Sequence, residues 1–273
     1  MIPAPFDYAR AESLDHAIDL LGSSEDAKLL AGGHSLLPLM KVRLARPSLL
    51  VDIGRLSDLS YVREDGDHVA IGALTRHHDV ANSELLRTSV PIVADAAEQI
   101  GDPQVRHVGT IGGSVAHADP ASDMPAVLVA LEAELVATGP GGATRTIAAG
   151  DFFTGLFESA LAPNEVLTEI RVPKTTGGYS YLKFHRRAID WALVGVAAAR
   201  SNGSVHVALT NMGDRPLRAS GVEEALAGGA DPAAASARAA EGTSPPSDAF
   251  GSAEYRQELA KVLVRRALEE AMG

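Results

Sequence analysis

The spacing of apolar residues in the first fifth of the chain predicts alternating short strands and helices. Apolar side chains recur at helical intervals from Leu14 to Leu21, between Ser13, a residue type that caps helix N-termini, and Gly22, a residue type that ends helices. The shorter apolar runs favour buried strands at 6–8, 28–31 and 49–53, with a short helix at 36–44. Together these elements predict a small α/β subdomain over about residues 1–54.

The pattern from about residue 55 to residue 173 predicts a second α/β subdomain. Thr75 can cap the segment that follows a strand at 68–74, and Pro91 suits the first turn of a helix at 91–100. The remaining apolar runs predict, in order, a helix, two strands joined by a glycine-rich turn, a short helix and a closing strand, at 125–131, 134–138, 144–147, 151–156 and 166–172. Leu167 is an apolar residue on the outer face of that closing strand, where it either covers a neighbouring side chain or contacts a ligand.

The pattern changes after the turn-like segment Pro173–Gly178, which we take as a domain boundary. Alternating segments at 179–185, 191–199 and 205–210 predict a three-stranded antiparallel sheet, with Asn202-Gly203 as a hairpin turn. The rest of the chain predicts a helix at 221–229, a loose connection at 230–247 and a last helix with one apolar side, formed by Tyr255, Leu259, Val262, Leu263 and Arg266. The whole chain is therefore predicted to be an α+β protein, with a C-terminal domain at 174–273.

Two glycine pairs stand at predicted element junctions, about eighty residues apart. The first is in Ala31–Ser35 (AGGHS), and the second is in Thr110–Ser114 (TIGGS), just before a polar stretch in which Asp123 can cap the next helix. Glycine lets the backbone approach a ligand closely, and successive N–H groups in such a turn form an anion-binding nest. Neither motif has the spacing of a Rossmann fingerprint or of a P-loop. Each pair is either an ordinary turn or one of two walls that converge on an anionic ligand, and in the second case we expect the backbone N–H groups of Gly32, Gly33, Gly112 and Gly113 to bind that ligand.

The sequence around both motifs resembles one protein family over essentially the whole chain. The segments AGGHSLLPLMKVRLARPSLLVDI and QVRHVGTIGGSVAHADPASDMPAVL are similar to those of the FAD-binding medium subunits of molybdenum hydroxylases, the carbon monoxide dehydrogenase and xanthine dehydrogenase type enzymes. The resemblance implies a PCMH-type FAD-binding domain over 1–173, made of the two subdomains, and a CO dehydrogenase flavoprotein-type domain over 174–273. It also implies that FAD is bound without a covalent link.

The resemblance further implies which residues contact the cofactor, and it implies no catalytic residue in this chain. The implied contacts are Ala31, Gly32, Gly33, His34, Ser35, Thr110, Ile111, Gly112, Gly113, Ser114, Asp123, Leu167, Lys183 and Trp191. A lysine near the isoalloxazine would stabilise the reduced ring, and Trp191, where relatives commonly carry Tyr, would cover one ring face. On residue type alone, Lys183 is equally a solvated lysine, Trp191 a core side chain and each hydroxyl a helix cap.

Composition excludes several classes of function. The chain has no cysteine, which removes Cys-ligated zinc and iron–sulfur clusters and fits a reducing cytoplasm. Its formal net charge of −11 disfavours nucleic acid and anionic membranes as partners. No apolar run approaches the ~20 residues of a membrane helix, and the N-terminus lacks the pattern of a secretory signal. The histidines have no metal-ligand spacing, so we expect no metal site, and no G-x-S-x-G elbow indicates a hydrolase.

The resemblance implies a division of labour among three subunits. A large molybdopterin-binding subunit would oxidise the substrate, a small iron–sulfur subunit would carry the electrons, and this chain would pass them through FAD to quinone, NAD or another acceptor. Two alternatives stay open: a stand-alone FAD-dependent oxidase or dehydrogenase, and a flavin-free binding module whose glycine pairs are plain turns. The sequence identifies neither the substrate nor the acceptor.

Overall fold

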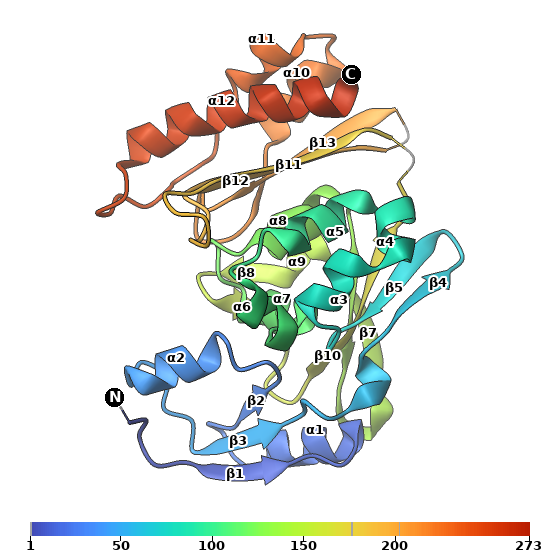
Figure 1. Cartoon of the computed structure of the whole chain (residues 1–273), viewed down its shortest axis with the longest axis vertical. Coiled ribbons are helices and arrows are strands. Elements are labelled where there is room, and N and C mark those ends of the chain that lie inside the picture. The colour runs from blue at the N-terminus through green and yellow to red at the C-terminus, as the bar shows by residue number, and fades with distance from the viewer. Residues whose placement is uncertain (1, 176, 202) are drawn as a thin grey trace.

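A three-stranded parallel sheet forms the N-terminal part of the protein. The computed structural model describes residues 2–175, 177–201 and 203–273. The first elements are β1 (Asp7–Arg10), α1 (Leu14–Gly22), β2 (Lys28–Leu30), α2 (Leu36–Lys41) and β3 (Leu49–Asp52), with strand order β1-β3-β2. Helix α1 begins as predicted, because the Ser13 hydroxyl accepts a hydrogen bond from the His16 N–H. Figure 1 shows this part at one end of the molecule, in blue.

A five-stranded antiparallel sheet of order β4-β5-β10-β6-β7 follows, and helices pack on it (Figure 1). Its strands are β4 (Val62–Asp65), β5 (His68–Gly72), β6 (Glu134–Thr138), β7 (Thr144–Ala148) and β10 (Val166–Pro173). The helices are α3 (His77–Asn82), α4 (Glu84–Ser89), α5 (Pro91–Glu98), α6 (Pro103–Val108), α7 (Ile111–His117), α8 (Asp123–Ala130) and α9 (Ala149–Phe152). Single 3₁₀ turns, η1 (Ser57–Leu59) and η2 (Pro140–Gly142), and a small hairpin, β8 (Phe153–Gly155) with β9 (Glu158–Ser159), complete this part.

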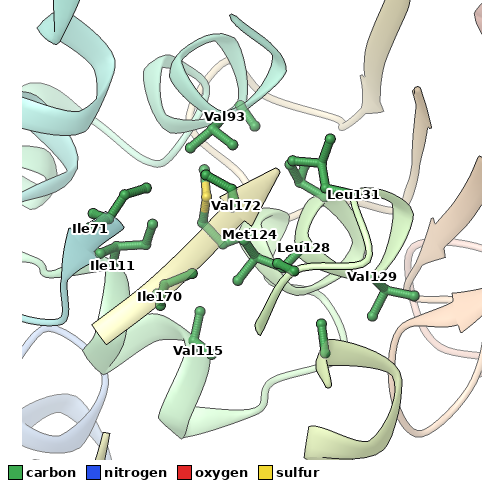
Figure 2. Close-up of a cluster of buried hydrophobic side chains, with 14 of the residues drawn as sticks. Ile71, Val93, Ile111, Val115, Met124, Leu128, Val129, Leu131, Ile170 and Val172 are labelled. Atoms are coloured by element: carbon green, nitrogen blue, oxygen red, sulfur yellow. The ribbon is translucent and has the colours of Figure 1, made fainter. Parts of the chain in front are cut away.

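The main core lies between this sheet and the helices. Figure 2 shows Ile111 of α7 and Met124 and Leu128 of α8 gathered near Ile170 of β10. All four side chains are fully buried, and burial of a side chain of this size contributes about 1.5–3 kcal/mol. This packing fixes the N-terminal ends of α7 and α8, which both point toward the cavity described below.

The C-terminal part is an antiparallel sheet with helices on its outer face. The sheet order is β11 (Tyr179–Phe184), β12 (Val194–Ser201), β13 (Ser204–Thr210) and β14 (Leu217–Arg218). Its helices are α10 (Ser220–Ala227), α11 (Pro232–Ser236) and α12 (Ala253–Met272). Figure 1 shows α12 above this sheet and the green helices α5 and α8 below it, and α8 contacts both β12 and β13. The sheet therefore joins the C-terminal helices to the middle of the molecule.

The α+β prediction is confirmed, and several details of it are corrected. The predicted three-stranded sheet has a fourth strand, β14, which spans two residues and is too short to show an alternating pattern. Asn202 of the predicted hairpin turn lies outside the described residues. The buried side of α12 is formed by residues such as Ala260, Val264 and Ala267, whereas Tyr255 and Val262 of the predicted side are exposed. Leu263 is buried and Leu259 packs against the same core, as predicted, so the prediction was wrong only for the other residues of that side, because alanines form much of the buried stripe.

Three corrections concern residues near the second glycine pair. Thr110–Ser114 is the beginning of helix α7 and not a turn, with Thr110 as its N-cap. Asp123 is the first residue of α8, and Ser122 occupies the N-cap position. Thr75 does not cap the next helix, α3, which begins at His77 with Arg76 as its N-cap; Thr75 instead exchanges hydrogen bonds with the backbone of Tyr61. In each case short polar segments gave too little periodicity to separate a turn from a single helical turn.

Candidate functional site

A cavity of about 710 Å³ lies where the three parts of the molecule meet. This volume is within the range of small-molecule sites, roughly 300–1,000 Å³. Its wall includes the predicted residues Ala31, Gly32, Gly33, His34, Ser35, Thr110, Gly112, Gly113, Ser114, Asp123, Leu167, Lys183 and Trp191. Ile111 is the one predicted residue outside the wall, because its side chain is fully buried in the main core.

The two glycine motifs lie directly against each other. A Cβ atom on Gly32 would stand 2.4 Å from the carbonyl oxygen of Val108, which lies just before the second motif. A Cβ atom on Gly113 would stand 3.8 Å from the Cβ of Ala31. Distances under 3 Å are too short for a real side chain, so the absence of a Cβ at Gly32 lets the two segments approach this closely. The motifs therefore form one continuous wall.

The first motif leaves its backbone donors free. Residues 31–35 connect β2 to α2, and Gly33 has a φ of +70°, a left-handed conformation that glycine adopts without strain. Within the described ranges, the N–H groups of Gly32, Gly33, His34 and Ser35 have no protein acceptor. The Ser35 hydroxyl likewise makes no capping bond to α2. Unpaired N–H groups on a cavity wall are donors for a ligand, and they favour an anion.

The second motif uses its backbone donors internally. The N–H of Gly112 donates to the Ala73 carbonyl at 2.8 Å, and that of Gly113 donates to the Thr110 hydroxyl at 3.1 Å. A Cβ on Gly112 would lie 2.4 Å from the Cβ of Ala73. The expectation that Gly112 and Gly113 supply free backbone donors is therefore wrong. These glycines instead let α7 begin against the end of β5, where Thr110 and Ser114 are part of the cavity wall.

A buried polar cluster joins α8 to β11 in the wall of the cavity. The Lys183 Nζ lies 3.0 Å from one Asp123 carboxylate oxygen and donates to the Gln99 carbonyl at 3.0 Å, while the Tyr181 hydroxyl donates to the other Asp123 oxygen at 2.5 Å. The Lys183 and Asp123 side chains are only 3% and 4% exposed, so the alternative of a solvated lysine is wrong. Burial raises the pKa of the Asp123 carboxyl, and Lys183 opposes this effect. Burial and the Asp123 carboxylate together hold the pKa of Tyr181 far above its usual value.

Trp191 is an exposed residue of the cavity wall, whereas Leu167 is a buried one. Trp191 is 57% exposed, which rules out the alternative of a core-filling side chain. Leu167 is 5% exposed and lies where β10 shifts register against β6, between Leu167 and Glu169. This irregularity explains why an apolar residue on the apparent outer face is buried at the cavity.

Sequence reasoning missed His77, a buried residue of the cavity wall. Its ring packs beside Gly109, and within the described part of the chain its Nδ1 atom has no hydrogen-bond partner. Burial lowers the pKa of His77 to about 4, so the ring is neutral at neutral pH. No signal in the sequence separates His77 from its half-buried neighbour His78.

Both halves of the chain match models of known families. Residues 4–175 match the model described as the FAD binding domain in molybdopterin dehydrogenase, and residues 179–271 match that of the CO dehydrogenase flavoprotein C-terminal domain. The chain belongs to the FAD-binding medium subunits of molybdenum hydroxylases. Members of this family are parts of oxidoreductases, and the cofactor of the medium subunit is FAD.

Individual relatives match over nearly their whole length. The chain is 43% identical to the carbon monoxide dehydrogenase medium chain of Hydrogenophaga pseudoflava, covering 99% of this chain and 98% of that one. It is 40% identical to the glyceraldehyde dehydrogenase medium chain of Sulfolobus acidocaldarius, covering 99% of both. The solved carbon monoxide dehydrogenase structure from H. pseudoflava matches with a TM-score of 0.95 at 44% identity, covering 100% of this chain and 99% of that one. Within the described ranges, no helix is both long and apolar enough to cross a bilayer.

Proposed function

We propose that this subunit seats FAD in the 710 Å³ cavity and passes electrons from iron–sulfur clusters of a partner subunit to an external acceptor. The observation that carries the proposal is the shared cavity, because both glycine motifs, Asp123, Leu167, Lys183 and Trp191 line it although they are distant in sequence. The partners are a molybdopterin-binding large subunit, where substrate is oxidised, and an iron–sulfur small subunit. The acceptor is a quinone or NAD.

The cavity fits a dinucleotide with a negatively charged phosphate bridge. The free N–H groups of residues 32–35 supply donors from the main chain itself, which suits a chain of net charge −11. We therefore assign the diphosphate to residues 31–35 and a supporting role to the hydroxyls of Thr110 and Ser114.

The electronic role of Lys183 differs from that of an isolated cation. When bound, FAD supplies the redox chemistry, and the protein supplies position and electrostatics. Because Asp123 neutralises Lys183 at 3.0 Å, the pair adds little net charge beside the ring. Lys183 therefore acts chiefly as a fixed hydrogen-bond donor whose direction is set by Asp123 and the Gln99 carbonyl.

The substrate of the assembly is recognised by another chain. Relatives that match this chain at 40–43% identity are named for different reactions, on carbon monoxide and on glyceraldehyde. A medium subunit of one fold thus serves several chemistries, which supports a common electron-transfer role. The alternative, a stand-alone FAD-dependent oxidase or dehydrogenase, predicts purification without partner chains.

The test is to purify the tagged chain from its source organism and to record its absorbance, metal content and copurifying chains. We expect a flavin spectrum that denaturation releases, with molybdenum and iron in the copurifying chains. In Gly33→Ala, a Cβ is forced onto a residue of φ +70° in the motif, and bound flavin should be lost. The matched control is Gly66→Ala, at φ +58° in open space between β4 and β5, which should keep its flavin. Colourless wild-type protein that refuses added FAD would refute the proposal.

A further inference from the structure

The loop that carries Trp191 has no regular structure of its own. Residues 185–193 connect β11 to β12, and their internal backbone bond joins Asp190 to Arg187. The loop is closed at its base, where the Leu193 N–H donates to the Phe184 carbonyl at 2.8 Å. Its residues Ile189, Asp190 and Trp191 nevertheless line the cavity. Something outside the loop must therefore fix its position.

Asn211 provides one attachment. Its side-chain Nδ2 donates to the Ala192 carbonyl at 2.8 Å, directly after Trp191. Its backbone N–H donates to the Pro120 carbonyl at 2.8 Å, in the connection between α7 and α8. Asn211 has a φ of +61°, a left-handed conformation that asparagine tolerates better than most residues. One residue at the end of β13 thus ties the Trp191 loop to the segment that leads into Asp123.

Arg256 provides the second attachment. Its Nη1 donates to the Leu193 carbonyl at 2.6 Å, and its Nη2 pairs with Asp248 at 2.7 Å. The guanidinium lies in the first turn of α12 and is 1% exposed, and its Nε has no partner within the described residues. Burying a guanidinium with incomplete pairing costs free energy. The hydrogen bond from Arg256 of α12 to the Leu193 carbonyl is therefore made despite the cost of desolvating the charge. Asp248, in turn, is fixed by the backbone N–H of Phe250.

We propose that Asn211 and Arg256 are positioning residues that latch the 185–193 loop, so that Trp191 stands over the cavity and covers the flavin ring. The two side chains donate hydrogen bonds to the carbonyls of two consecutive residues, Ala192 and Leu193. The donors come from two segments that do not themselves line the cavity. The latch rests on the proposed function in that FAD is the group that Trp191 would cover. It assigns part of the cofactor site to the C-terminal helix and sheet.

The sole tryptophan makes the test direct, because all indole emission of the full chain comes from Trp191. Asn211→Asp keeps the side-chain shape, the tolerance of positive φ and the backbone bond to Pro120, but removes the amide donors. Compared with wild type, we expect lower emission anisotropy without FAD, and FAD affinity weakened about fivefold to tenfold, as for loss of one or two hydrogen bonds. Arg256→Lys, which keeps the charge and one donor, should show a smaller change of the same kind.

Asn82→Asp is the matched control. The Asn82 amide also donates to a backbone carbonyl, that of His78 at 2.7 Å, but at an exposed helix end away from the cavity. It should leave both anisotropy and FAD affinity unchanged. Wild-type anisotropy and affinity in Asn211→Asp would overturn the latch. If anisotropy falls in that variant but neither it nor wild type binds FAD, the latch stands and the proposed function fails. If wild type binds FAD without quenching of Trp191, the covering role is wrong.

Discussion

The two glycine motifs have nearly the same composition but opposite local structure. In the first motif the N–H groups of residues 32–35 have no protein acceptor within the described ranges, and these residues line the cavity. In Thr110–Ser114 the corresponding groups are bonded to Thr75, Ala73 and Thr110, at the start of a packed helix. The first motif therefore has free donors for the FAD that we propose it binds, and the second motif packs closely against its neighbours. A glycine pair by itself does not reveal which of these it serves.

The comparison predicts that residues whose polar or backbone groups are paired within the protein, here called the packed side, determine its stability. Residues 31–35, here called the open side, should determine its affinity for FAD. Variants of the packed side should unfold more readily whether or not FAD is present. Variants of the open side should keep their stability without FAD and lose only the stabilisation that bound FAD adds.

The largest loss of stability among variants of the packed side is expected for Asp123→Asn, at the first residue of α8. This variant leaves the Lys183 ammonium buried without its counterion, and breaking a buried pair in this way costs about 3–5 kcal/mol. Urea unfolding of the chain without FAD measures the loss. In the double variant Asp123→Asn with Lys183→Met, the unpaired charge is gone, so much of the loss should be recovered. Equal destabilisation in the single and double variants would contradict the role of charge.

A smaller loss of stability is expected for Gly112→Ala, which tests the close packing of the second motif by adding one methyl group. The new Cβ would stand 2.4 Å from the Cβ and 2.6 Å from the carbonyl oxygen of Ala73, and overpacking of this kind costs about 1–3 kcal/mol. Thermal unfolding measures it. Gly150→Ala, in α9 with open space around its Cβ, is the control and should be neutral or slightly stabilising. A wild-type melting temperature for Gly112→Ala would show that α7 does not need this close approach to β5.

Part of this architecture could be predicted from the sequence. Amphipathic helix α1, with its Ser13 cap, and the longer strands have a clear periodicity, so they were placed within a few residues. The alternation predicted for 179–185 is also confirmed in β11, since Tyr179 and Tyr181 both bond residues of the middle part while Ser180 bonds Glu270 of α12.

The other features of the site depend on tertiary contacts that local sequence patterns do not reveal. Whether an N–H group of a glycine is free depends on which carbonyl lies beside it, and Ala73 is 39 residues from Gly112 in sequence. The pairing of Lys183 with Asp123 and the burial of His77 depend equally on tertiary packing. Asn211 and Arg256 gave no sequence signal, because their partners are backbone carbonyls, which every residue has.

The smallest and most discriminating effect compares two hydroxyls, one from each motif. Ser35 makes no capping bond to α2, so Ser35→Ala should leave the chain without FAD as stable as wild type and weaken FAD binding by about fivefold, the effect of one hydrogen bond. Thr110 caps α7 by accepting from the Gly113 N–H, so Thr110→Ala should lower stability without FAD by about 1 kcal/mol. Ser13→Ala, which removes the cap of α1 far from the second motif, calibrates that loss. Melting temperatures measured with and without FAD separate the two patterns. If Ser35→Ala destabilised the free chain as much as Thr110→Ala does, the first motif would be as structural as the second, and the division between open and packed donors would be wrong.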